Sequence, residues 1–239
     1  MRHLAFVTLI LILNHFGDEA RNAIDLISLR LIFGFFLKAI LGFLVVKNMK
    51  NSIYLKNSKT LFGIALCVVS LYYTIVEINL PISITVLGLV YCLSVGFLEE
   101  ALCRDVIYTN LRKRYGMIVS LFLASTIFGL LHFGNMFHKG MDPLSVVNQV
   151  WGAFILGVLF QAIYIRYGNL LLVACVHGCI NLLGSYKTLI LNERSITSGG
   201  EYEFYPTFLF MLVFFIVLVL PISLFLISTG KNKLACDVI

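Results

Sequence analysis

The sequence predicts an all-α protein, a polytopic transmembrane helical bundle of about eight spans that forms a single transmembrane domain over residues 1–239. The first observation is composition: 60% of the residues are hydrophobic and 13% are charged, against about 45–50% and about 25% in soluble domains. The second is that apolar runs long enough to cross a hydrocarbon core of about 30 Å recur along the chain. These observations exclude a water-soluble globular protein. Because lipid cannot satisfy an open backbone, the spans must be helical.

Eight apolar segments follow one another along the chain, and each predicts one membrane-crossing helix. The first is short and could lie at the membrane interface instead, which would leave seven spans. The segments lie at roughly 4–16, 22–46, 60–78, 81–103, 116–134, 144–165, 169–187 and 206–229.

The connections between these segments alternate in charge. The excess of 18 Lys and Arg over 12 Asp and Glu would suggest nucleic acid in a soluble protein, but here it orients the chain, and we expect no nucleic acid partner. Every second connection is basic, so the positive-inside rule places both termini of this multi-pass protein in the cytoplasm. The basic connections contain Lys47, Lys50, Lys56 and Lys59, then Arg112, Lys113 and Arg114, then Arg166, then Lys231 and Lys233.

The six cysteines lie mostly inside the apolar segments, and none forms a CxxC pair. This pattern is typical of small buried apolar residues and not of a disulfide framework. The last four residues, from Cys236 to Ile239, formally read C-a-a-X, but the acidic second position makes them a poor prenylation signal.

Ionisable side chains inside apolar spans are costly at membrane depth and usually mark a functional site. The fourth segment carries Glu99 and Glu100, with Arg104 four residues after Glu100. On a helix Arg104 neighbours Glu100 and can neutralise it, whereas Glu99 points about 100° away. Glu99 is therefore the freer carboxylate and the candidate general base. The alternative interpretation, an interfacial charge cluster that ends a helix, fits these three residues equally well.

Two further segments carry polar pairs at helical spacing. The fifth has Phe128 and His132 one turn apart on one face, and the seventh has His177 and Asn181 at the same spacing. Taken alone, His132 is typical of a structural histidine near a helix end, and the other pair is typical of a hydrogen bond between helices. Because these residues and Glu99 lie on three helices of one bundle, a shared polar pocket is the simpler interpretation.

We expect this pocket in the cytoplasmic half of the bundle. At a rise of 1.5 Å per residue, Glu99 lies ~20 Å and His132 ~27–30 Å from the connection near Arg112. His177 lies ~13 Å from the Arg166 side. The greater depth of His132 requires a tilted helix or an offset connection.

In these motifs the sequence resembles the CPBP family of intramembrane proteases, which includes the type II CAAX prenyl proteases and the Abi-like bacteriocin-immunity proteins. The resemblance covers roughly residues 80–187 and implies a catalytic core there. It implies an intramembrane endopeptidase that hydrolyses a peptide bond of a membrane-associated peptide or protein with an activated water. The three motifs occur in the family's order: EExxxR from Glu99 to Arg104, FxxxH from Phe128 to His132, and HxxxN from His177 to Asn181.

The resemblance also implies a role for each residue. Glu99 and His132 would activate the water, His177 and Asn181 would steady the oxyanion or hold the water, and Glu100, Arg104 and Phe128 would support them. Alternatively, Glu99, His132 and His177 could ligate zinc in an open catalytic site. We favour the chemistry that needs no cofactor, and the zinc alternative stays open. The HExxH, GxGD and rhomboid-like GxSx motifs of other intramembrane proteases are absent from the sequence.

Two other functions are compatible with polar residues inside the spans. A proton-coupled transporter would carry them too, but it predicts paired broken helices or a repeated motif, and the sequence has neither. A non-catalytic immunity or scaffold protein would bind a peptide through the same pocket. We expect membrane lipid and a peptide or protein substrate as partners in a bacterial cell membrane. Pheromone or bacteriocin precursor processing and self-immunity are the candidate roles.

Overall fold

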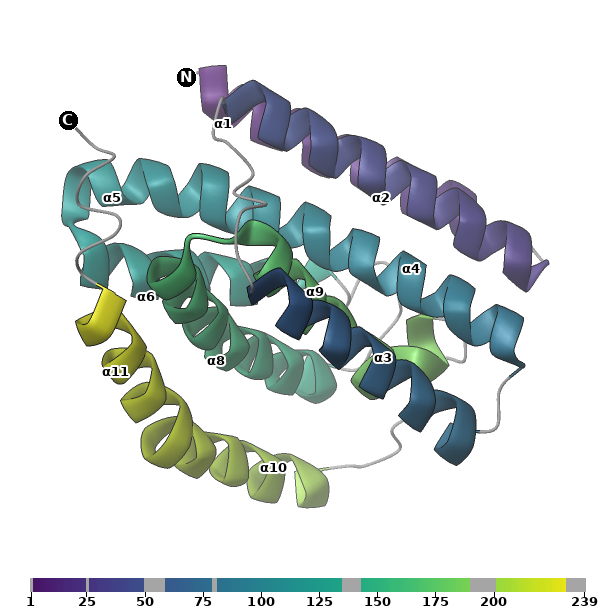
Figure 1. Cartoon of the computed structure of the whole chain (residues 1–239). Helices are drawn as coiled ribbons and strands as arrows, with labels where there is room; N and C mark the ends of the chain where they lie inside the picture. The colour runs from purple at the N-terminus through teal and green to yellow at the C-terminus, as the bar shows by residue number, and fades with distance from the viewer. Residues whose placement is uncertain are drawn as a thin grey trace. The chain divides into compact units, whose positions relative to one another are not determined.

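The computed structural model describes residues 2–24, 26–49, 59–78, 81–134, 143–189 and 201–230. Every regular element in these ranges is a helix, which confirms the all-α prediction (Figure 1). The chain divides into two compact units: Met1–Val106 with Asn169–Glu193, and Ile107–Gly168 with Arg194–Ile239. The idea that one transmembrane domain covers the whole chain stays a prediction.

The first unit is organised around α4 (Ile82–Glu100). This helix packs against both α2 (Ile27–Met49) and α9 (Leu170–Leu189). Two further helices complete the unit: α1 (Arg2–Asn22) packs on α2, and α3 (Lys59–Ile78) packs on α9. In Figure 1, α2 runs alongside α4.

Glycines allow α2 and α4 to approach closely. A Cβ atom on Gly34 would lie 2.6 Å from the ring of Tyr91, and one on Gly42 would lie 2.6 Å from the ring of Phe97. Small residues at such contacts let helices associate where lipid is as apolar as the side chains. Since the two contacts advance in the same direction along both helices, α2 and α4 run parallel.

A polar cluster joins α1 to α2 and α4 inside this apolar unit. The Lys38 Nζ atom lies 2.6 Å from Oδ2 of Asp18 and 2.6 Å from the amide oxygen of Asn14. Arg21 donates a hydrogen bond to the hydroxyl of Tyr91. Lys38 and Arg21 are both buried. Because a buried charge is costly without a partner, the Lys38–Asp18 ion pair holds α1 against α2.

The fourth predicted segment extends further than the sequence analysis expected. α4 continues through the π-helical stretch η1 (Ala101–Tyr108) into α5 (Thr109–Tyr115), so the predicted end near residue 103 is wrong. The predicted basic connection from Arg112 to Arg114 forms the last turn of α5. The chain turns only at Gly116, whose φ of 75° lies in the left-handed region that favours glycine. Lys and Arg are good helix formers, so a basic tract does not by itself end a helix.

The second unit packs α6 (Met117–Leu131) against α8 (Pro143–Tyr167). α8 also contacts a rod made of α10 (Glu201–Phe214), η2 (Phe215–Val219) and α11 (Leu220–Gly230). The core of the unit is apolar and includes Leu121 of α6 and Val158 of α8. A Cβ atom on Gly157 would lie 3.2 Å from the ring of Phe128, so α6 and α8 are in close contact there.

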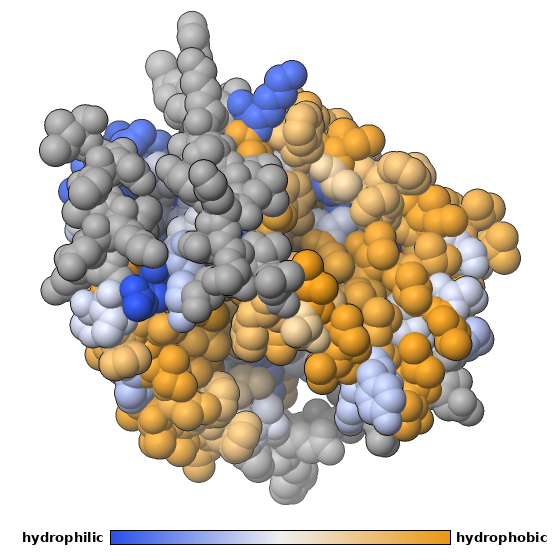
Figure 2. Space-filling model, in the orientation of Figure 1, coloured by the Kyte–Doolittle hydropathy of each residue, from blue (hydrophilic) through white to orange (hydrophobic). Residues whose placement is uncertain are grey.

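Among the described residues, four helices are long and apolar enough to cross a membrane: Ile27–Lys47, Ile82–Tyr115, Pro143–Tyr167 and Leu209–Thr229. Shorter apolar helices cover Phe62–Tyr73, Met117–Leu131 and Leu170–Gly184. Many large hydrophobic side chains are exposed, and hydrophobic residues predominate in the coloured part of the face in Figure 2. Water would penalise such a surface, so the chain is a membrane protein.

The predicted apolar segments all contain a helix, but the number of spans stays a prediction. The first segment, 4–16, lies within α1, which is longer than the segment. Most of the connection between the last two segments lies outside the described residues, as do the C-terminal residues from Cys236 to Ile239.

Candidate functional site

Glu99 and Glu100 end α4, and the two neighbours face different surroundings. The Glu100 side chain is fully buried, with 0% relative exposure, whereas the Glu99 side chain is 35% exposed. Consecutive residues of a helix point about 100° apart, which is the divergence expected from the sequence. Water or a substrate can therefore reach Glu99 but not Glu100.

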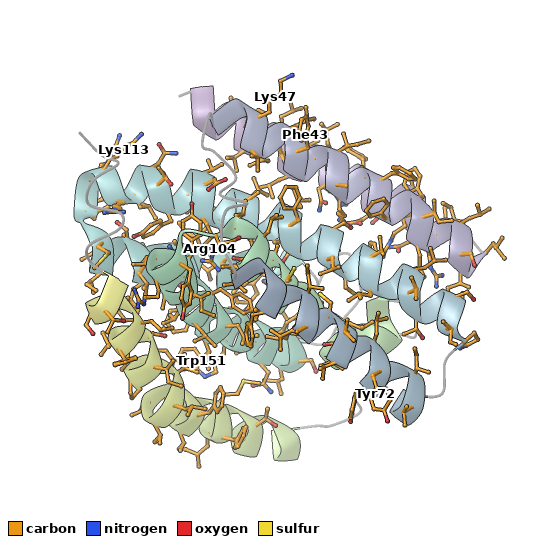
Figure 3. The ribbon with its side chains drawn as sticks, in the orientation of Figure 1. Phe43, Lys47, Tyr72, Arg104, Lys113 and Trp151 are labelled. Carbon is orange, nitrogen blue, oxygen red and sulfur yellow. The ribbon has the colours of Figure 1, made fainter. Side chains whose placement is uncertain are left out.

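Arg104 pairs with Glu100 from the first turn of η1. Its Nε atom lies 2.6 Å from Oε2 of Glu100, and both side chains are fully buried. The contact expected from the i,i+4 spacing is therefore present. Each charge cancels the other, which offsets the cost of removing both from water. Arg104 and Lys113, both labelled in Figure 3, belong to the continuous helical stretch that runs from α4 through η1 to α5.

His177 of α9 connects the two carboxylates. Its Nδ1 atom lies 2.9 Å from Oε1 of Glu100, and its Nε2 atom lies 3.5 Å from Oε2 of Glu99. Glu100 is ion-paired and accepts the Nδ1 hydrogen, which fixes the orientation of the ring. When the ring is neutral, the Nε2 lone pair faces the Glu99 carboxylate. Two adjacent acceptors repel each other unless they share a hydrogen donor, and water is such a donor.

Two glycines bring α4 and α9 together at this point, and the sequence analysis missed both. A Cβ atom on Gly96 would lie 2.8 Å from the carbonyl oxygen of Ala174 and 3.3 Å from the Cβ of His177. A Cβ atom on Gly178 would lie 2.8 Å from the Cα of Leu93. Any larger residue would push the helices apart and carry His177 away from Glu100. The available signal was a glycine near a polar residue within an apolar span: Gly178 directly follows His177, and Gly96 lies three residues before Glu99.

Asn181 follows His177 by one turn of α9, which is the spacing the sequence analysis used. Its side chain is half-buried. The first unit therefore contains five of the predicted site residues: Glu99, Glu100, Arg104, His177 and Asn181.

Phe128 and His132 belong to the second unit. Phe128 is buried on α6, and His132 follows the last residue of that helix. The His132 Nδ1 atom donates to the backbone oxygen of Phe128 at 3.0 Å, and the two rings meet edge to face with centroids 5.1 Å apart. The FxxxH motif thus orients its histidine locally. The approach of His132 to Glu99 stays a prediction.

The zinc ligands stay a prediction. Glu99 and His177 offer two donor atoms side by side, and Glu100 supports the histidine as a carboxylate often supports a metal-binding histidine. Among the described residues, no group of three or more His, Cys, Asp or Glu side chains is arranged to hold a metal ion. The third predicted ligand, His132, lies in the second unit.

Lys38 is a charged neighbour of the site that the sequence analysis did not single out. Its charge interacts with that of Glu99 as well as with that of Asp18. The signal was a lysine in the middle of the apolar run 22–46, where a charge rarely lies without a partner.

Comparison with protein families supports the resemblance seen in the motifs. The family described as type II CAAX prenyl endopeptidase Rce1-like matches residues 81–183, which is consistent with the CPBP family. The matched segment contains all three motifs and every candidate site residue. The match implies a CAAX-type intramembrane protease that acts on a peptide or protein in a membrane environment. Comparison with curated proteins and with solved structures gave no significant match.

Proposed function

From the Rce1-like sequence of residues 81–183, we propose that the chain is an intramembrane endopeptidase whose attacking water is held by Glu99 and His177. One observation carries this proposal. The ring of His177 has one nitrogen on the buried Glu100 and the other beside the half-exposed Glu99. The first contact is structural, and the second leaves two acceptors that a water can bridge.

The water donates one hydrogen to Oε2 of Glu99 and the other to Nε2 of His177. Its lone pair is then free to attack the carbonyl carbon of the scissile peptide bond. As the new C–O bond forms, Glu99 takes the proton from the water. Glu99 then passes this proton to the leaving nitrogen as the C–N bond breaks. The products are a carboxylic acid, which ionises, and an amine.

The negative charge on the substrate oxygen needs hydrogen-bond donors. We assign this role to the amide of Asn181, one turn after His177 on the same helix. We assign His132 to the activation of the water, because the FxxxH motif implies this role. Its Nδ1 hydrogen is used by the Phe128 backbone oxygen, so Nε2 is the atom that would meet the water or the substrate.

Glu100 and Arg104 act as positioning residues. Their ion pair gives Glu100 a permanent negative charge, and Glu100 in turn holds the tautomer of His177 that has a lone pair at Nε2. A ring held this way needs no rearrangement before the water is activated. If a zinc ion binds, Glu99 and His177 would hold it, and it would supply Lewis-acid activation of the water.

The experiment uses the full chain in proteoliposomes with two quenched fluorescent peptides. One ends in a prenylated CAAX sequence, and the other is a membrane-anchored peptide precursor without a prenyl group. We expect cleavage of the peptide precursor, loss of cleavage in Glu99→Gln, and no effect of a metal chelator. Binding without cleavage of either peptide would favour a scaffold or immunity protein. Chelator inactivation that zinc reverses would establish the metal-dependent alternative.

A further inference from the structure

Three thiols meet where α3 packs against α9. The Sγ atoms of Cys67 on α3 and Cys179 on α9 lie 3.6 Å apart. Cys175, one turn before Cys179, is a third thiol near Cys67. The sequence predicted buried cysteines, yet Cys67 and Cys175 are only half-buried. Two thiols in contact across a helix interface can form a disulfide, which a single packed thiol cannot. The partial exposure of Cys67 and Cys175 also leaves these thiols accessible to a reagent.

The backbones of the two helices are close at this point. A Cβ atom on Gly63 would lie 3.1 Å from the Cβ of Cys175. Gly63 and Cys67 are one turn apart on α3, and Cys175 and Cys179 are one turn apart on α9. The Gly63–Cys175 and Cys67–Cys179 contacts are therefore successive contacts along the same helix interface. A disulfide needs Cβ atoms about 3.5–4.5 Å apart. The sulfur atoms of Cys67 and Cys179 lie 3.6 Å apart, so they must approach by a further ~1.6 Å to reach the S–S length of about 2.05 Å.

A bond here would change how α3 is held. α3 packs mainly against α9, and its other face exposes Phe62, Ile64, Val68, Val69, Tyr72, Tyr73 and Val76. Figure 3 labels Tyr72 on this helix. A covalent link at Cys67 would fix this outer helix to the helix that carries His177.

We propose that Cys67 and Cys179 form a dithiol–disulfide pair that a lipid-soluble quinone oxidises. Two S–H bonds break and one S–S bond forms, and the two protons and two electrons reduce the quinone to the hydroquinone. A quinone is the suitable oxidant because both thiols lie in apolar helices, where a lipid-soluble molecule can reach the half-buried Cys67 and a charged oxidant cannot. This modification site is independent of the proposed peptidase chemistry, since neither sulfur belongs to the group of Glu99, Glu100 and His177.

The test treats the full chain in proteoliposomes with one of two reagents. Copper–phenanthroline reports whether the sulfur atoms can bond. A fully substituted benzoquinone with a short alkyl tail, which has no open ring position for thiol addition, tests the oxidant class. After alkylation and non-reducing digestion, we expect two of the six thiols to be protected and one peptide pair to join Cys67 to Cys179. Dithiothreitol should separate this pair.

Variants identify the pair. We expect Cys67→Ser and Cys179→Ser each to abolish the cross-link, and Cys92→Ser and Cys175→Ser to leave it intact. A bond from Cys67 to Cys175 would overturn the assigned pair. Cross-linking by copper–phenanthroline but not by the quinone would overturn the oxidant, and no cross-link with either reagent would overturn the site. Size-exclusion profiles that match the wild type show that each variant has folded, so a lost cross-link then reports on the sulfur atoms.

Discussion

The Nδ1 atom of His177 lies 2.9 Å from Oε1 of Glu100, although 77 positions separate the two residues in the chain. The other oxygen of the same carboxylate lies 2.6 Å from Nε of Arg104. Glu100 thus links His177 on α9 to Arg104 at the start of η1. The other ring nitrogen of His177, Nε2, lies beside Glu99. The positions of the Arg104 and His177 side chains in the candidate site depend on this one buried carboxylate.

Replacing Glu100 should destabilise the fold. In Glu100→Gln, Arg104 loses the negative charge that it faces in a fully buried position, which costs about 3–5 kcal/mol when one partner of a buried pair is removed. We expect a lower midpoint of thermal denaturation in detergent. Glu99→Gln is the matched control: its side chain is partly exposed, and we expect a change within about 0.5 kcal/mol. Equal stability of the two variants would contradict the buried ion pair.

The close approach of α4 and α9 can be tested by adding a single methyl group. Gly96→Ala places a Cβ 2.8 Å from the carbonyl oxygen of Ala174, and overpacking of this kind costs about 1–3 kcal/mol. We expect lower stability and, because His177 is displaced, a lower kcat. Gly184→Ala on α9 is the control, since its added Cβ has no neighbour within 4 Å and alanine is favoured over glycine in a helix. The same result in both variants would argue against the helix contact.

The Lys38–Asp18 pair should behave as a coupled unit. Lys38→Met leaves Asp18 without its cation, and Asp18→Asn leaves a buried lysine without its carboxylate. Each single variant should lose stability, whereas the double variant should recover most of the loss because no unpaired charge remains. Thermal denaturation of the four proteins measures the coupling free energy. Additive losses would show that the pair does not stabilise the fold.

His132 is predicted to act in the same reaction step as Glu99. His132→Ala should lower kcat without lowering the denaturation midpoint, because only local contacts with Phe128 are lost. If both residues act on one water, the double variant with Glu99→Gln should be no slower than the slower single variant. Cleavage rates measured in liposomes decide this. Losses that multiply would place His132 outside the step that Glu99 catalyses.

Much of the fold could be predicted from local sequence because a segment that crosses lipid must be apolar and helical. Apolar runs predicted the helices, and the i,i+4 spacing predicted the Glu100–Arg104 contact. The end of the fourth segment was predicted wrongly, since the tract from Arg112 to Arg114 resembles a membrane-edge connection. Those side chains lie on a helix that continues to Gly116, and nothing in the local pattern marks the π-helical stretch before it.

The partners within the site were harder to predict. The motifs indicated that Glu99 and His177 belong to one pocket, but the sequence alone could not assign Nδ1 of His177 to Glu100. That contact depends on how α4 and α9 pack, which Gly96 and Gly178 decide. The structure places His177 beside Glu99, and the pairing of Glu99 with His132 that the resemblance implies stays a prediction.

The most direct test of the account is the kcat of Glu99→Gln for a membrane-anchored peptide, compared with that of Glu19→Gln, an exposed glutamate on α1. The amide fills the same space but cannot accept the proton of the water. If Glu99 is the general base, kcat falls by about 10²–10⁴-fold in Glu99→Gln, and Glu19→Gln cleaves like the wild type. Full cleavage by a folded Glu99→Gln variant would contradict the role of Glu99 as the general base.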